Sequence, residues 1–171
     1  MRQTIGVFVS LISIVFLLTL ILISAATIAK ANETGCQHDE YNFRCVSYVK
    51  NYDADTITFD IAGVHPLLGK HISIRVLGVD APEIKTKNLC EKKKAKEAQK
   101  IVETLLKKAE RIDLENVTRG KYFRIVADVV IDGESLTRYL INNSLAYAYD
   151  GGTKTNVNWC QFDQKRLPAS K

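Results

Sequence analysis

Three short segments of this 171-residue chain contain charged side chains suited to phosphodiester chemistry. Their sequences are DADTITFD, IRVLGVDAPE and GKYFR. The first contains Asp55, the second contains Arg75, Asp80 and Glu83, and the third contains Arg124. Two acids able to hold a hard cation, one further acid and two arginines are the groups needed to hydrolyse a phosphodiester.

Asp55 and Asp80 are the candidate metal ligands. Asp55 lies in a turn before one expected strand, and Asp80 lies just past the end of another. If these strands are neighbours, both carboxylates meet at one end of the sheet. Hard divalent cations take oxygen ligands, so the two carboxylates, the carbonyl of Ala81 and waters predict a calcium site. The alternative is that each aspartate only caps its own turn.

The remaining candidates are groups that handle protons, phosphate and bases. Glu83 follows a proline and is a candidate general base toward water. Arg75 and Arg124 are candidates to clamp a phosphate and to stabilise the charge that develops on it. Lys121 and Tyr122, beside Arg124, are candidates to bind a phosphate and to stack on a base. Taken singly, each is equally explained as a surface residue.

Alternating apolar and polar residues predict five short strands, at residues 43–52, 56–61, 71–78, 111–117 and 123–131. Residues 63–69 are expected to form a loop. Helical spacing of apolar residues predicts a long helix over 90–110 and a second over 134–143, with Leu136, Tyr139 and Leu140 on its apolar side. This order predicts an α+β fold of the OB type, a five-stranded β-barrel with two to three packed α-helices.

The amino-terminal residues predict export. Residues 5–29 carry no charge and are mostly apolar, Arg2 precedes them, and small residues follow in an A-x-A arrangement that ends at Ala31. This pattern predicts a signal peptide over residues 1–31. The run is also long enough to span a bilayer, so an uncleaved membrane anchor is the alternative. Both readings place the domain outside the cytoplasm, and only the second implies contact with a membrane.

The mature chain would begin with a polar segment, residues 32–42, and end with a tail, residues 153–171. All four cysteines, Cys36, Cys45, Cys90 and Cys160, follow the leader, and an even number after an export signal predicts two disulfides. Of three possible pairings we favour Cys36 with Cys45 and Cys90 with Cys160. No CxxC spacing is present, which argues against zinc. The net charge of +5 is modest, but lysines crowd residues 85–96 and would attract a polyanion.

Together these segments resemble the thermonuclease (staphylococcal-nuclease-like) family over about residues 43–152. DADT resembles the acidic turn of that family, RVLGVDAPE its arginine–aspartate–glutamate block and GKYFR its lysine–tyrosine–arginine segment. The resemblance implies an OB-fold barrel and calcium-dependent hydrolysis of DNA and RNA that leaves 3'-phosphates. Three departures are present: Ala54 and Phe123 replace glycines of the family pattern, and Ala81 stands where threonine is often found.

By position, the resemblance also implies roles for individual residues. Asp55, Asp80 and the Ala81 carbonyl would ligate calcium, and Arg75, Glu83 and Arg124 would be catalytic. The nucleotide contacts would come from Lys121, Tyr122 and Tyr149.

We expect a monomer. Two other functions are weighed against a nuclease: a non-catalytic OB module that binds nucleic acid at the cell envelope, and an envelope protein that recognises a protein or glycan. The complete acid–arginine set favours the nuclease, because binding alone does not require it.

Overall fold

A computed structural model describes residues 35–162 of the chain. The chain divides into two units, residues 1–37 and 38–171, and the description below concerns the second. The predicted leader and residues 163–171 of the predicted tail lie outside the described residues. Between residues 35 and 162, no helix is both long enough and apolar enough to cross a membrane.

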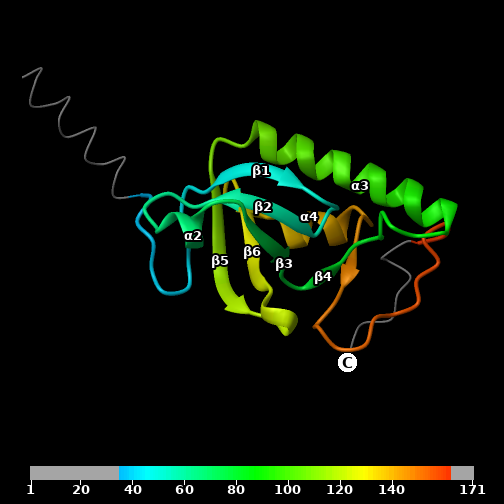
Figure 1. The fold of residues 1–171 in the computed structure, drawn as a ribbon. Helices are drawn as coiled ribbons and strands as arrows, with labels where there is room; N and C mark the ends of the chain where they lie inside the picture. Colours follow the sequence, from blue (N-terminus) through cyan, green and yellow to red (C-terminus); the bar gives the residue numbers. More distant parts are fainter. Residues whose placement is uncertain (1–34, 163–171) are drawn as a thin grey trace, which may run out of the picture. The chain divides into compact units, whose positions relative to one another are not determined.

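The main element is a six-stranded mixed sheet (Figure 1). Its strands follow the order β1-β2-β3-β6-β5, and β7 pairs with β6. Only the β3–β6 pair is parallel. The bounds are Ser47–Asn51 for β1, Thr56–Asp60 for β2, Ile72–Val76 for β3, Ile112–Arg119 for β5, Ile125–Ile131 for β6 and Glu134–Ser135 for β7. Two further strands, β4 (Val79–Asp80) and β8 (Tyr147–Ala148), form a separate antiparallel pair.

The α+β, OB-like fold is as predicted, but the sheet is not closed into a barrel. The edge strands β1 and β5 share no ladder. The segment before β1 contacts β5 without forming a continuous ladder. An isolated bridge joins Phe43 to Leu114, the Val46 N–H donates to the Ile112 carbonyl at 2.9 Å, and the Val117 N–H donates to the Tyr41 carbonyl at 2.8 Å. The predicted strand over 43–52 is interrupted because Cys45 adopts a positive φ of 53°, and its N–H donates to the Asp113 carboxylate instead.

The long predicted helix is confirmed as α3 (Leu89–Lys108), which lies along β1 in Figure 1. The side chain of Asn88 caps its first turn by accepting hydrogen bonds from the N–H groups of Cys90 and Glu91. The buried face consists of four small or aliphatic side chains, Ala95, Ala98, Val102 and Leu106. A helix with one apolar face and lysines on the other folds by packing that face on the sheet.

Two short helices differ from the predictions. The expected loop over 63–69 contains α2 (Pro66–Gly69), which starts at a proline and is capped by His65. The helix predicted over 134–143 begins later, as α4 (Leu136–Asn142), because residues 134–135 pair with β6. Tyr139 is 37% exposed and does not belong to the buried side of α4.

The core follows the alternation of β2 and β3. Ile57, Phe59, Ile74 and Val76 are at most 1% exposed. Since successive side chains of a strand point to opposite faces, Arg75 is directed away from the core by its buried neighbours on both sides.

Candidate active site

Arg75 joins the two aspartates that the sequence singles out as metal ligands. Its Nη1 donates to Asp55 Oδ1 at 2.6 Å, and its Nη2 donates to Asp80 Oδ1 at 2.5 Å. The register explains the contact, because Thr56 pairs with Arg75 and the start of β2 therefore lies beside the end of β3. Gly78, with φ of 81°, makes the turn that brings β4 and Asp80 back toward the same point.

Asp55 is almost completely enclosed, with 1% of its surface exposed. Its Oδ2 accepts the Ala81 N–H at 2.7 Å, and Oδ1 accepts the Thr56 hydroxyl at 3.2 Å in addition to Arg75. Burial first, and then the neighbouring charge of Asp53, raise the pKa of this carboxyl to about 8, although Arg75 opposes the shift. Asp53 is itself buried, at 4% exposed. The site therefore holds more negative charge than Arg75 neutralises.

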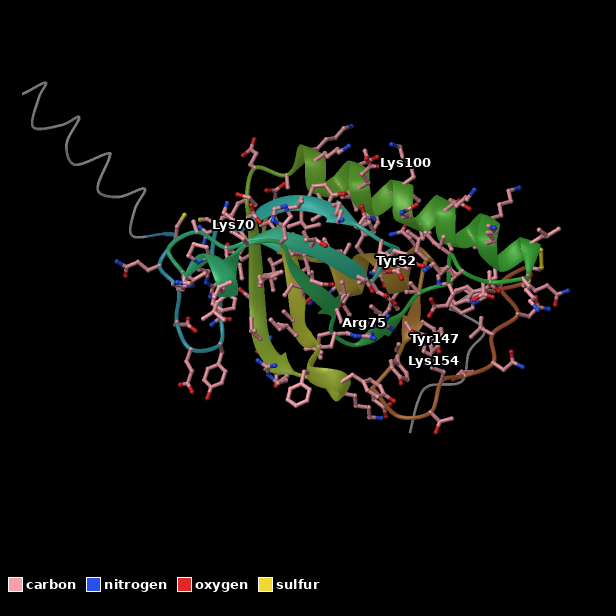
Figure 2. The ribbon with its side chains drawn as sticks, viewed as in Figure 1. Tyr52, Lys70, Arg75, Lys100, Tyr147 and Lys154 are labelled. Carbon is pink, nitrogen blue, oxygen red and sulfur yellow. A yellow bond between two sulfur atoms is a disulfide. The ribbon has the colours of Figure 1, made fainter. Side chains whose placement is uncertain are left out.

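Asp80 is the point where three parts of the chain meet. Besides Arg75, its carboxylate accepts a hydrogen bond from the Tyr147 hydroxyl at 2.9 Å and forms an ion pair with the Lys154 ammonium at 3.0 Å. Arg75, Tyr147 and Lys154 lie close together in Figure 2. Burial raises the pKa of the Tyr147 hydroxyl, and the acceptor Asp80 raises it further, so this phenol stays a donor at neutral pH.

Glu83, the predicted general base, lies beside this cluster and is open to solvent. About 45% of its side chain is exposed, and its Oε1 pairs with Lys154 at 3.0 Å. The Glu83 N–H donates to the Glu91 carboxylate at 3.2 Å, and that carboxylate also accepts the Thr86 hydroxyl. The first turn of α3 thus fixes the backbone on which Glu83 is mounted. Lys154 bridges Glu83 to Asp80, because one ammonium contacts both carboxylates.

The predicted substrate contacts lie on a second, exposed surface. Lys121 and Tyr122 occupy the turn between β5 and β6, and Tyr122 is 91% exposed. Lys121 Nζ donates to the Gly151 carbonyl at 2.8 Å, and the Tyr149 hydroxyl donates to the next carbonyl, Gly152, at 2.8 Å. Two of the three predicted nucleotide contacts, Lys121 and Tyr149, therefore bond to adjacent glycines just before the tail.

Arg124 is not joined to the carboxylate cluster. It is exposed, and among residues 35–162 its side chain makes no hydrogen bond or ion pair. Arg75 and Arg124, predicted as a pair of phosphate clamps, thus have different surroundings. One is held by two buried carboxylates, and the other is available to a ligand.

The donor set suits a hard divalent cation. Four carboxylates, those of Asp53, Asp55, Asp80 and Glu83, lie around two cationic side chains, which leaves a formal charge of −2 when Asp55 is ionised. Oxygen atoms are the ligands that calcium prefers. Within the described part of the chain, however, no three acidic, histidine or cysteine side chains form a complete metal cage. The carbonyl of Ala81 and water would have to complete the coordination.

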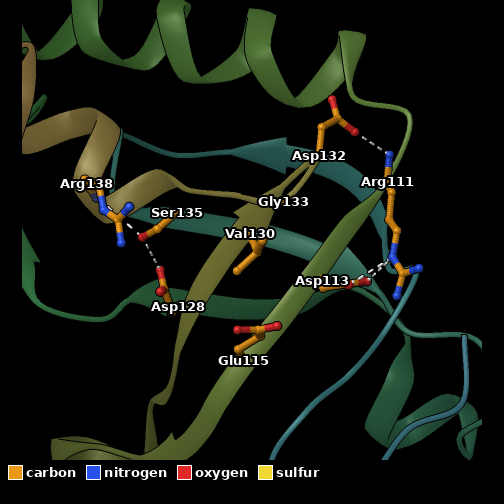
Figure 3. Close-up of a pocket in the computed structure, with 9 residues that line it drawn as sticks. All are labelled: Arg111, Asp113, Glu115, Asp128, Val130, Asp132, Gly133, Ser135 and Arg138. Atoms are coloured by element: carbon orange, nitrogen blue, oxygen red, sulfur yellow. Dashed lines mark hydrogen bonds and ion pairs between the residues drawn. The ribbon is translucent and has the colours of Figure 1, made fainter. Parts of the chain in front are cut away.

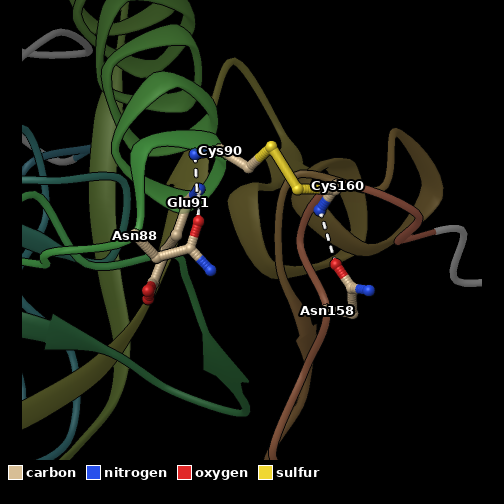
Figure 4. The surroundings of a disulfide bond; sticks show 5 residues. All are labelled: Asn88, Cys90, Glu91, Asn158 and Cys160. Carbon is tan, nitrogen blue, oxygen red and sulfur yellow. Dashed lines mark hydrogen bonds between the residues drawn. A yellow bond between two sulfur atoms is a disulfide. The ribbon is translucent and has the colours of Figure 1, made fainter.

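A disulfide connects the tail to the start of α3 (Figure 4). Cys90 and Cys160 are bonded, as predicted, with their Cα atoms 5.4 Å apart. Asn158 caps the tail turn by accepting the Cys160 N–H, and Trp159 is buried against Tyr147. Cys36 and Cys45 are disulfide-bonded as well, so none of the four cysteines is free. The tail that presents Lys154 is therefore covalently held near Glu83.

A cleft away from this cluster includes none of the predicted site residues. It has a volume of about 490 Å³ and is formed by β5, β6 and the turn that precedes α4 (Figure 3). Its acidic side chains already have partners: Asp113 pairs with Arg44 and Arg111, and Asp128 accepts from Ser135. These contacts explain its charged lining as a set of structural ion pairs.

Two residues of the site escaped the sequence analysis. Lys154 is one of several polar residues in the tail, and nothing beside it in the sequence marks it. The available signal was the favoured Cys90–Cys160 pairing, since it returns the tail to the start of α3, close to Glu83. Tyr147 alternates with Tyr149 along one segment, and no motif marks it. Their rings lie 6.4 Å apart, but only Tyr147 contacts an acid of the site.

Comparison with known proteins gives two similarities. The family model described as staphylococcal nuclease homologue matches residues 73–165, which is more than half of the chain. Among curated proteins, the chain is similar to a Bacillus subtilis (strain 168) protein named endonuclease YncB, with 35% identity over 109 residues. The matched region covers 60% of this chain and 51% of that protein, so the chain spans about half the length of the curated relative.

Proposed function

The chain belongs to the family of staphylococcal nuclease homologues, and we propose that it is a calcium-dependent nuclease that hydrolyses DNA and RNA. The observation that supports this proposal best is the convergence of Asp55, Asp80 and Arg75 at one end of the sheet, with Glu83 linked to the same cluster through Lys154. A simple binding surface does not need buried carboxylates, which cost free energy to desolvate.

The proposed roles follow from these surroundings. Asp55, Asp80 and the Ala81 carbonyl would hold calcium, which when bound supplies a Lewis acid and a template for the phosphate. Glu83, the one exposed carboxylate of the cluster, takes a proton from the water that attacks phosphorus. Arg75 and Arg124 stabilise the negative charge that develops on the phosphate oxygens. The P–O5' bond breaks, so one fragment keeps the phosphate on its 3' oxygen and the other leaves with a 5' hydroxyl.

We also propose that the protein acts outside the cytoplasm. Disulfides persist in oxidising compartments, and all four cysteines are disulfide-bonded. The sequence pattern of residues 1–31 supports export by a signal peptide, with a retained anchor as the alternative.

The test is cleavage of single-stranded DNA and RNA by the purified protein, with calcium and then with a chelator. We expect calcium-dependent fragments that end in 3'-phosphate. Glu83→Gln is nearly the same size but cannot accept the proton, and should lower turnover by about 100-fold or more. Glu97→Gln, the same change on the exposed face of α3, is the matched control and should have no effect. Full activity of Glu83→Gln would refute its role.

One observation favours the non-catalytic alternative, in which the protein only binds nucleic acid. The aromatic and cationic turn between β5 and β6 is exposed and lies apart from the carboxylate cluster. Salt-sensitive binding of oligonucleotides without cleavage, in calcium and at several pH values, would support that alternative and exclude the nuclease.

A further inference from the structure

The turn between β5 and β6 presents two large aromatic rings to solvent. Tyr122 is 91% exposed and Phe123 is 82% exposed. Phe123 stands where the family pattern has glycine, and Tyr122 is the only one of the two that the resemblance assigns to the substrate. A phenylalanine ring is normally removed from water, so two adjacent exposed rings call for a partner.

The backbone forces this exposure. Both residues have a φ of 58°, in the left-handed region that side chains bearing a Cβ adopt rarely. The turn is closed by a 2.8 Å hydrogen bond from the Gly120 N–H to the Arg124 carbonyl, and Lys121 Nζ ties it to Gly151. The rings are therefore held outward by an ordered turn, at a conformational cost that packing does not explain.

Unneutralised cations surround the two rings. The guanidinium carbon of Arg119 lies 5.8 Å from the centre of the Phe123 ring, and its Nη1 donates to the Phe123 carbonyl at 3.4 Å. Within residues 35–162, neither Arg119 nor Lys121 nor Arg124 forms an ion pair with a carboxylate. Of the other arginines between residues 35 and 162, Arg44, Arg75 and Arg111 have acidic partners, whereas Arg138 forms no ion pair. The turn thus has a positive charge that a polyanion can neutralise.

Aromatic rings interleaved with free cations are the arrangement that binds single-stranded nucleic acid, because bases stack on the rings and phosphates contact the cations. We propose that Phe123, backed by Arg119, is a second base-stacking surface beside Tyr122. The two rings bind successive unpaired bases, so the protein prefers single strands to duplexes. In a duplex the base faces are already stacked and are not available. This inference rests on the proposed function for its class of substrate.

Phe123→Gly is the informative variant. Glycine adopts a positive φ without strain, so the change removes the ring without disturbing the turn. The assay is fluorescence anisotropy of a labelled single-stranded oligonucleotide with the full-length protein in chelator, where calcium-dependent cleavage does not interfere. We expect affinity to fall by about 5- to 100-fold, the measured range for one stacked base. Phe123→Trp should retain it, and Leu68→Ala, an exposed apolar residue on α2, is the control for surface changes.

An oligonucleotide with abasic sites separates stacking from charge. Wild type and Phe123→Gly should bind it equally, since it has phosphates but no bases. Three results would overturn the proposal: unchanged affinity of Phe123→Gly for the normal strand, an equal loss on the abasic strand, or equal affinity of the wild type for single strand and duplex. Cleavage with calcium is measured separately. If Phe123→Gly loses base-dependent binding but the wild-type protein never cleaves, the nuclease is refuted and this inference stands.

Discussion

Arg75 and Arg124 should differ in what they do for the fold, although both are proposed to act on the phosphate. Arg75 neutralises Asp55 and Asp80, which are 1% and 4% exposed. Arg75→Met keeps most of the volume, leaves the buried Asp55 without its cation and leaves Asp80 with Lys154 alone. Removing one partner of a buried ion pair costs about 3–5 kcal/mol. Arg124→Met removes an exposed side chain without a partner and should change stability by less than about 0.5 kcal/mol.

Urea unfolding in chelator at pH 9, above the pKa of about 8 of Asp55, measures this difference. With a denaturant slope of about 2 kcal/mol per molar, a loss of about 4 kcal/mol shifts the midpoint of Arg75→Met down by about 2 M, whereas the midpoint of Arg124→Met stays in place. Both variants should lose turnover. Adding Asp55→Asn to Arg75→Met should recover part of the stability, because the carboxylate that lost its cation is then replaced by a neutral amide. Equal midpoints for the two arginine variants would refute the reasoning.

Three further predictions concern the same site. Because the pKa of Asp55 is raised to about 8 from 3.8, its contribution to the stability of the metal-free protein is full below about pH 4 and is lost as pH rises through 8. Urea unfolding at pH 5, 7 and 9 should show this decline in wild type and a weaker one in Asp55→Asn. An identical dependence of stability on pH in the two proteins would contradict it. Lys154→Met removes the ammonium that competes with calcium for the carboxylates of Glu83 and Asp80. Calcium affinity measured by calorimetry should therefore rise about fivefold, and weaker binding would refute the competition. Replacing Cys90 and Cys160 together by serine should lower the free energy of unfolding by about 2–4 kcal/mol, as measured by thermal unfolding. An unchanged melting temperature would show that the disulfide does not stabilise the fold.

The residues that the sequence analysis located best are those whose positions follow from local rules. The alternation around Ile74 and Val76 predicts which way Arg75 points, and the apolar stripe predicts α3 within two residues at each end. The first strand was less predictable, because the positive φ of Cys45 and its bond to Asp113 depend on a strand almost seventy residues away. Such contacts arise from tertiary structure and leave no periodic signal.

The site shows the same division. Asp55 and Asp80 meet at Arg75 because they lie at the ends of adjacent strands. The roles of Tyr147 and Lys154 do not, since each meets Asp80 from more than sixty residues away along the chain. The exposure of Phe123 was also beyond reach, because the departure from glycine alone does not say whether the ring is turned inward or outward.

The internal cations of the site have one further consequence. Arg75 and Lys154 neutralise part of the acidic cluster, so they can hold its carboxylates together before any ion is added. This differs from small metal domains, in which the binding free energy of the ion is the folding free energy. If calcium binds as proposed, it would meet carboxylates that are already in place. The protein would then fold in calcium-poor surroundings without being active, and the local calcium concentration would decide when it becomes active.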